Sequence, residues 1–185
     1  RPDLTGTEDE LDEFYGNLGE IYKDNVDIIM CESMSSIFEG SNASRVAKEF
    51  SERVWLSWTN RGHQPDQLPS TEALSKAVDF SIEADVECTL INCSHADMAS
   101  NSIKELKRTS RFGIFANSST FKEVDLSIAT KDVDAIHHLN SEKISAKEYA
   151  MIALSWVKEG AFVVGGCCGT TVEHTREIKL LMDRL

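Results

Sequence analysis

Short apolar runs alternate with segments of helical periodicity along the whole chain. The runs are rich in Val, Ile and Phe and occupy residues 26–30, 54–58, 88–91, 112–115 and 162–164. A short continuous apolar run is typical of a strand that is buried on both faces of a parallel sheet. The alternation therefore predicts an α/β protein in which each strand is followed by a helix.

The predicted helices begin at capping boxes, in which a Ser or Thr and a Glu three residues later satisfy free backbone N–H groups. Four pairs have this spacing: Thr7 with Glu10, Ser36 with Glu39, Ser145 with Glu148, and Thr170 with Glu173. The helix that follows Ser145 shows one apolar face, made of Tyr149, Ile152, Ala153 and Trp156. Gly160 is a suitable C-cap for this helix.

Polar side chains lie at the carboxyl end of each predicted strand. They are Glu32, Thr59, Asn92 with Cys93, Asn117, and Cys167 with Cys168. A doubly wound sheet and a TIM barrel both fit the order of elements, but only a barrel brings all five strand ends to one mouth, where the chemistry of this fold is found. We therefore predict a (βα)8 TIM-barrel type of fold. The aperiodic connection 117–145 is predicted to be a long loop over that mouth.

Composition excludes several classes of partner. The 185 residues suit a single domain, and 31 acidic against 19 basic residues give a formal charge of −12, which repels nucleic acids and anionic membranes. The most apolar stretch, 160–168, is far shorter than the roughly 20 residues that a membrane span needs. No signal-peptide pattern opens the chain, and the five cysteines lack paired spacing, so a cytoplasmic protein with reduced thiols is expected.

Three of those cysteines predict a catalytic zinc site. Cys167 and Cys168 stand between glycines directly after a strand, and Cys93 ends a strand two places earlier in the same sheet. Inward side chains of alternate barrel strands share a layer, so the three thiols can converge. Three ligands with one open position are typical of catalytic zinc, and an all-thiolate site suits a thiol substrate. The alternative for the vicinal pair is two buried thiols or a strained disulfide.

The motifs that carry this chemistry resemble the homocysteine S-methyltransferase family. They are GGCCGT at 165–170, NCS at 92–94, CES at 31–33, ESMSSIFE at 32–39, VWLSW at 54–58 and the segment 149–160. Nearly the whole chain is covered by the resemblance. Two departures replace prolines of the family pattern, at Ala116 and at Val172, and neither removes a ligand.

The resemblance implies that a (βα)8 barrel binds Zn2+ through Cys93, Cys167 and Cys168 and methylates homocysteine to methionine. Glu32 would hold the amino group of homocysteine, and Asn117 would line the mouth. The methyl donor would be a sulfonium, S-methylmethionine or S-adenosylmethionine, or the quaternary ammonium betaine. No further acid or base is needed, because a neutral sulfide or amine leaves without a proton.

The same resemblance indicates that the barrel is incomplete. Residues 1–185 would form one homocysteine-binding domain that covers strands four to eight, and residues 1–25 already look like the helix before strand four. A second hypothesis is therefore a truncated, catalytically silent zinc-binding chain, which would assemble with a missing N-terminal half or with another copy. A third is the homocysteine module of a cobalamin-dependent methionine synthase, which is disfavoured because nothing follows residue 185.

The remaining candidates are predicted to be structural. Cys31 and Cys88 are expected to pack in the core, and Trp58 is expected to pack in the barrel, with a place beside the methyl donor as its alternative. The histidines at 95, 137, 138 and 174 are expected to be surface or loop residues and not metal ligands.

Overall fold

The computed structural model describes residues 2–121 and 141–184. Most of the predicted loop 117–145, with its two adjacent histidines, therefore lies outside the described residues. Helices η1 (Pro2–Leu4) and α1 (Glu8–Tyr22) open the chain and precede the first strand. None of the helices in the described part of the chain has the length and apolar character that crossing a bilayer requires.

Five parallel strands form the central sheet, and a helix follows each of them. The strands are β1 (Ile29–Met34), β2 (Val54–Trp58), β3 (Cys88–His95), β4 (Phe112–Asn117) and β7 (Val163–Gly166). The helices are α2 (Ile37–Phe50), α3 (Leu74–Glu83), α4 (Ala96–Asn101), α5 (Ile103–Leu106), α7 (Ala146–Lys158) and α8 (Val172–Met182). A small antiparallel hairpin, β5 (Ser119–Phe121) with β6 (Ser141–Lys143), lies between β4 and α7.

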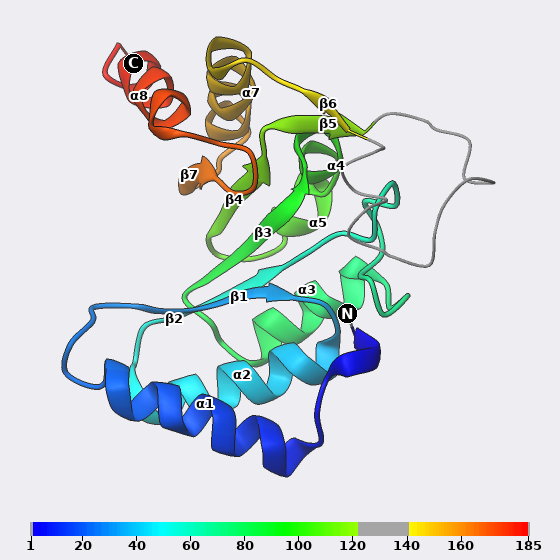
Figure 1. The fold of residues 1–185 in the computed structure, drawn as a ribbon, viewed down its shortest axis with the longest axis vertical. Helices are drawn as coiled ribbons and strands as arrows, with labels where there is room; N and C mark the ends of the chain where they lie inside the picture. The colour runs from blue at the N-terminus through cyan, green and yellow to red at the C-terminus, as the bar shows by residue number, and fades with distance from the viewer. Residues whose placement is uncertain (1, 122–140, 185) are drawn as a thin grey trace.

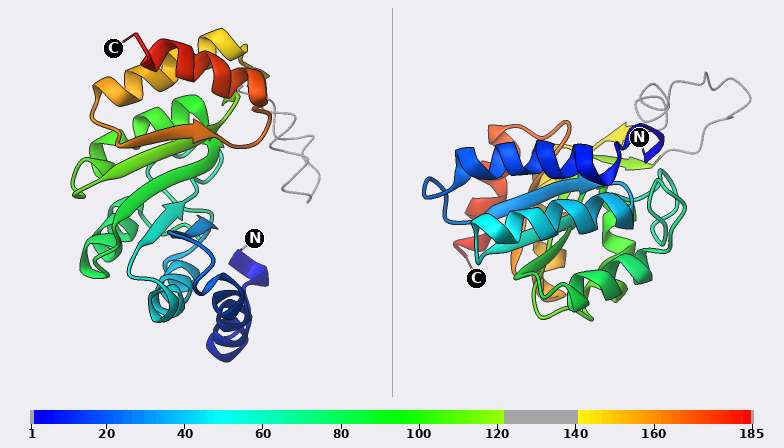
Figure 2. Two further views of the ribbon diagram at one scale, coloured as in Figure 1. Left: turned by 90° about the vertical axis from the view of Figure 1, so that its left-hand side faces the viewer. Right: turned by 90° about the horizontal axis from the view of Figure 1, so that it is seen from below.

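The strand order separates a barrel from a doubly wound sheet. The order is β1-β2-β3-β4-β7, so each strand pairs with the one before it in the sheet and the direction of winding never reverses. A doubly wound sheet contains such a reversal, at its ligand site. Figure 1 shows α1 and α2 at one end of a curved sheet and α7 and α8 at the other, and Figure 2 shows the helices outside the curve. The fold is therefore the five-stranded arc of a barrel, as predicted.

The outer face of the arc packs against the helices. Side chains that point outward, such as Leu56, Ile91 and Ile114, are fully buried in the core between the sheet and its helices. Trp58 also faces outward, because its indole N–H donates to Ser81 Oγ at 2.9 Å and its ring meets Phe80 edge to face. Trp58 is thus a packing residue of the outer layer, and it does not line the mouth.

Strand ends are the part of the prediction that needs correction. The first strand was expected at 26–30 but runs over Ile29–Met34, and β3 extends to His95. The polar residues at 32, 92 and 93 therefore lie inside the strands and not after them. Both strands shift register near this end, between Cys31 and Met34 in β1 and between Asn92 and His95 in β3. Such bulges bend a strand and re-aim its side chains.

Helix starts follow the predicted caps in most cases. Thr7 and Ser145 each close a full capping box with the Glu three residues later. Ser36 accepts the backbone N–H of Glu39, but the Glu39 carboxylate turns to the backbone and hydroxyl of Ser35 instead of closing the box.

Helix α7 closes the C-terminal end of the core. Tyr149, Ala153 and Trp156 of the predicted apolar face are fully buried, whereas its fourth residue, Ile152, is partly buried against the core. The helix ends with Glu159 as C-cap, and Gly160 follows at φ 103°, a left-handed conformation that favours glycine.

Candidate metal centre at the barrel mouth

Three cysteine sulfurs meet at the carboxyl ends of β3 and β7. The Sγ atom of Cys93 lies 2.9 Å from that of Cys167 and 3.6 Å from that of Cys168. All three sulfurs lie within 4.8 Å of one another. Sulfurs bound to one tetrahedral zinc at about 2.3 Å would be about 3.8 Å apart. The cluster thus has the size of a metal site, and the closest pair needs to open by about 1 Å.

Cys93 reaches the cluster through an unusual backbone conformation. Its φ is 50°, in the left-handed region, and it lies within the bulge of β3. Ser33, in the corresponding bulge of β1, has φ 63°. Residues other than glycine rarely adopt this conformation, and such strain clusters at functional sites. The two bulges thus place left-handed residues on neighbouring parts of the mouth, at Ser33 in β1 and at Cys93 in β3.

Strand β4 holds the turn that carries the other two cysteines. The backbone N–H of Cys167 donates to the carbonyl of Ala116 at 2.8 Å, and that of Cys168 donates to Asn117 Oδ1 at 3.1 Å. The Cys168 carbonyl accepts from the Ser118 N–H at 3.0 Å. Asn117 thus contacts the cysteine turn directly, and its predicted substrate role stays a prediction.

Helix α8 begins one residue later than the sequence predicted. Thr170 does not cap the helix, because its hydroxyl donates to the Cys167 carbonyl at 2.6 Å inside the turn. Thr171 is the N-cap, and Nδ1 of His174 accepts its backbone N–H at 3.1 Å. Gly169, at φ 76°, provides the left-handed residue that lets the chain leave the cysteines and enter the helix so quickly.

The thiols share their protons unequally. A hydrogen bond between Cys93 and Cys167 lowers the pKa of Cys167 to about 6 and raises that of Cys93 far above its ordinary value. Desolvation raises the pKa of Cys168. The hydrogen bonds of the cluster therefore favour a thiolate at Cys167 over one at Cys93 or Cys168, and a cation between the sulfurs would favour all three thiolates.

Cys31 and Cys88 take no part in the cluster. Both are buried and free of disulfides, and burial raises the pKa of each to about 12. They pack as small apolar side chains, which agrees with the sequence prediction.

A buried polar network joins the other strand ends to the cysteines. Asn92 is fully buried, and its Nδ2 donates to Glu32 Oε1 at 3.1 Å, so the exposed Glu32 is held by the residue that precedes Cys93. Ser57 of β2 donates to Asn92 Oδ1 at 2.6 Å, and Thr59 Oγ1 lies 3.5 Å from the Cys93 carbonyl. All five strands therefore contribute to one connected mouth.

The two described histidines at 95 and 174 are buried, so the prediction that they are surface residues is wrong. His95 is 3% exposed and shares a hydrogen bond with Ser119 of the hairpin, and His174 is 9% exposed and packs edge to face on Tyr149. The His95 ring is hydrogen-bonded to Ser119, and the His174 ring to Thr171, and a hydrophobic period along the sequence does not reveal such contacts. His137 and His138 lie outside the described residues.

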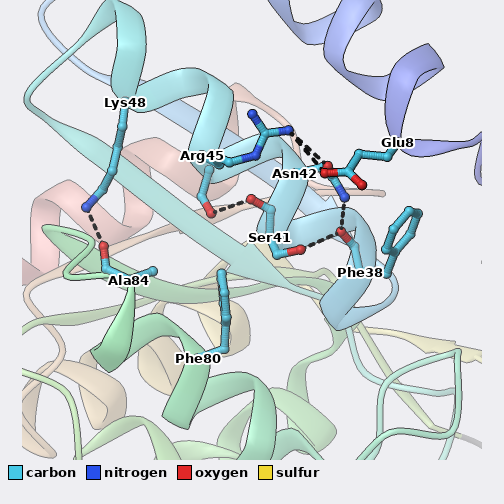
Figure 3. Close-up of a pocket in the computed structure, with 9 residues that line it drawn as sticks. Glu8, Phe38, Ser41, Asn42, Arg45, Lys48, Phe80 and Ala84 are labelled. Carbon is cyan, nitrogen blue, oxygen red and sulfur yellow. Dashed lines mark hydrogen bonds and ion pairs between the residues drawn. The ribbon is translucent and has the colours of Figure 1, made fainter.

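A separate hollow lies in the outer layer, away from the cysteines. Its volume is about 490 Å³, and residues of α1, α2 and α3 line it. Figure 3 shows Phe38 of α2 and Phe80 of α3 on its walls. Its cations are already engaged: Arg45 pairs with Asp12, and Lys48 donates to the Asp85 carbonyl at 3.0 Å. This hollow is a groove between neighbouring helices, and no cysteine lines it.

Comparisons with known proteins agree on one family. The sequence model described as homocysteine S-methyltransferase matches residues 2–182. The homocysteine S-methyltransferase YbgG of Bacillus subtilis (strain 168) is 26% identical over 176 residues, which are 93% of this chain and 52% of YbgG.

Solved structures show the same fold. The metallated form of the homocysteine methyltransferase MmuM from Escherichia coli matches with a TM-score of 0.73 at 19% identity, over 97% of this chain and 54% of that chain. Its apo form matches with a TM-score of 0.71 at 17% identity, over 96% of this chain and 58% of that chain. The chain thus spans about half the length of the relatives it matches.

Proposed function

The chain belongs to the homocysteine S-methyltransferase family, and on this premise we propose that it holds zinc through Cys93, Cys167 and Cys168 and methylates homocysteine to methionine. The observation that carries the proposal is the meeting of three thiols within 4.8 Å at the mouth of a barrel arc. The substrate would be a thiol, because a soft sulfur completes a thiolate site best.

The donor set fits zinc better than other common ions. Three cysteine sulfurs are soft ligands, which select zinc over the hard cations magnesium and calcium. Three protein ligands leave one position open, as in catalytic zinc sites. Zinc bound there would lower the pKa of a coordinated thiol, so that it reacts as a thiolate at neutral pH.

Two other residues of the mouth would bind the substrate while the methyl group is transferred. Glu32 is exposed and carries a carboxylate that can pair with the ammonium group of homocysteine. Asn117 would line the mouth beside the cysteine turn. The substrate sulfur would form a bond to the methyl carbon of the donor while the bond between that carbon and the donor's sulfonium sulfur breaks. The donor leaves as a neutral sulfide and needs no general acid.

The donor would be S-methylmethionine or S-adenosylmethionine. Both are sulfonium ions, whose methyl group is activated by the positive charge. The net charge of −12 favours the approach of cationic donors. We place this methionine-forming reaction in the cytoplasm, because five free thiols suit a reducing compartment.

A second function is favoured by the open edges of the sheet. Among the described residues, β1 and β7 each have one unpaired edge. Residues 1–185 would bind zinc without catalysing transfer unless further barrel strands or a second copy covered those edges. Size-exclusion chromatography with light scattering, with and without zinc, measures such self-association.

Metal content and methionine formation test the proposal together. We expect about one zinc per chain in the wild type, and methionine from homocysteine with at least one of S-methylmethionine, S-adenosylmethionine and betaine. Cys93→Ser should lose the zinc, whereas Cys88→Ala, which removes a buried thiol outside the cluster, should keep it. Zinc without methionine would support the silent chain, and a wild type without zinc would refute both functions.

A further inference from the structure

The side-chain amide of Asn92 uses its whole capacity for hydrogen bonds. Its Oδ1 accepts from the Ser33 N–H at 3.0 Å and from Ser57 Oγ at 2.6 Å. Its Nδ2 donates to Ser33 Oγ at 2.7 Å and to Glu32 Oε1 at 3.1 Å. An asparagine amide has two acceptor and two donor positions, so none is left over. A fully buried amide with this many partners has one orientation.

The direction of the amide follows from the backbone. The Ser33 N–H can only donate, so the atom of Asn92 that faces it must be the oxygen. The amino group must then point toward Glu32. The Glu32 carboxylate is therefore fixed at Oε1 by a neutral donor, while the side chain remains exposed at the mouth.

The same residue borders the metal centre. Asn92 directly precedes Cys93, and both lie where β3 shifts register and Cys93 turns to φ 50°. Any displacement of the Asn92 side chain would thus move the carboxylate at one end of the mouth and the backbone of a cysteine at the other.

We propose that Asn92 is a positioning residue that sets the spacing between Glu32 and the cysteine cluster, and that it thereby selects thiols bearing an ammonium group. The inference rests on the proposed function, because it takes the cluster as the place of the substrate sulfur. Glu32 alone would attract any cation. When Asn92 holds it, the Glu32 carboxylate binds only an ammonium group that lies at a fixed distance from the substrate sulfur, as in an amino acid that carries a thiol.

Two ligands separate this role from a general effect on folding. Homocysteine and 4-mercaptobutanoate share the thiol and the carboxylate, but only homocysteine has the amino group. Their dissociation constants for the zinc-loaded chain are measured by calorimetry for the wild type and for Asn92→Ala. Asn92→Ala should weaken homocysteine about tenfold relative to 4-mercaptobutanoate, the scale of one hydrogen bond to a charged group. An equal loss for both ligands would overturn the proposal.

Three further variants make the test robust. Ser57→Ala removes one partner of Asn92 without touching Glu32, and it should lower the same selectivity two- to threefold even where Asn92→Ala does not fold. Asn60→Asp alters another buried amide, bonded to Pro65 and Ser102, and should leave the selectivity unchanged. In a Glu32→Gln background, Asn92→Ala should add no further loss of selectivity. Independent losses, or an unchanged Ser57→Ala, would contradict the proposal.

A measurement without substrate separates this inference from the proposed function. The Asn92 side-chain amide protons in the ¹⁵N spectrum of the full chain should shift when Glu32 is replaced by alanine. An unmoved resonance would mean that Asn92 does not hold Glu32, whatever the chain binds. A moved resonance in a zinc-loaded chain that binds neither thiol would refute the proposed function and the claim of selectivity, while the contact itself would stand.

Discussion

Replacing Gly113 by alanine tests how closely β4 must approach its neighbours for the mouth to form. Gly113 lies in β4 and pairs with Val163 of β7 and Leu90 of β3. A Cβ atom at this position would lie 2.5 Å from Val163 Cγ1, 2.9 Å from the Val163 carbonyl oxygen and 3.0 Å from Leu90 Cδ2. Carbon atoms in normal contact are about 3.5–4.0 Å apart.

The size of the effect follows from which atoms can move. The Val163 side chain can change its rotamer, but its carbonyl oxygen belongs to the sheet and moves only if the strands separate. Overpacking of this kind typically destabilises the folded state by about 1–3 kcal/mol. Alanine also loses less conformational entropy on folding than glycine does, and this offsets about 0.5–1 kcal/mol of that cost. The difference is a loss of roughly 1 kcal/mol in the unfolding free energy of Gly113→Ala, which corresponds to about 2–4 °C in Tm.

Urea denaturation followed by circular dichroism measures this loss, and the chain contains a matched control. Gly16 lies inside helix α1, where an added Cβ would meet nothing within 4 Å. Gly16→Ala should raise the unfolding free energy by about 0.5–1 kcal/mol, because alanine favours helix more than glycine does. The same substitution thus has opposite signs at two positions. A Gly113→Ala chain as stable as the wild type would show that the contact between β4 and β7 is not as tight as described.

Two further predictions concern Tyr149 and Cys167. The Tyr149 hydroxyl contacts the carbonyls of Ala116 and Gly165 at 2.7 and 2.8 Å. Tyr149→Phe should therefore lower the unfolding free energy by about 1 kcal/mol in urea denaturation and weaken zinc binding measured by competition with a chelator. An unchanged zinc affinity would contradict this prediction. Because the pKa of Cys167 is lowered to about 6 from about 8.5 in an unfolded chain, the metal-free folded chain binds fewer protons between these values. The unfolding free energy should therefore rise with pH across this window, and the contribution of Cys167 should be lost as the pH falls through about 6. The absorbance of the thiolate should increase near pH 6. A flat absorbance below pH 8 would refute the assignment.

The sequence predicts those features of the fold that depend on local pattern. Five apolar runs give the five strands in their correct order, and capping boxes at Thr7 and Ser145 give two helix starts, because a strand or a cap is encoded within a few residues. The cysteines at the strand ends are found in the same way, since strand order alone brings Cys93 near Cys167.

The errors have a common physical origin in contacts between distant residues. Strand β1 extends to Met34 because a bulge and pairing with β2 continue it, and no local pattern signals either. His174 is buried because it caps α8 through Thr171 and packs on Tyr149. The role of Asn92 was missed for the same reason, since its partner Glu32 is 60 residues away. A buried amide in an otherwise apolar strand was the available signal.

The mouth is strained and stabilised at the same place, which argues that its parts act as one unit. Ser33 and Cys93 both have left-handed backbones, each at a cost on the order of 1–3 kcal/mol. Asn92 lies between them: it binds the backbone and hydroxyl of Ser33 and precedes Cys93 in the chain. Its four hydrogen bonds, at about 1 kcal/mol each, offset strain of that size. The strained backbones of Ser33 and Cys93 and the hydrogen bonds of Asn92 thus belong to one connected unit, so a change at any of the three residues should disturb the other two.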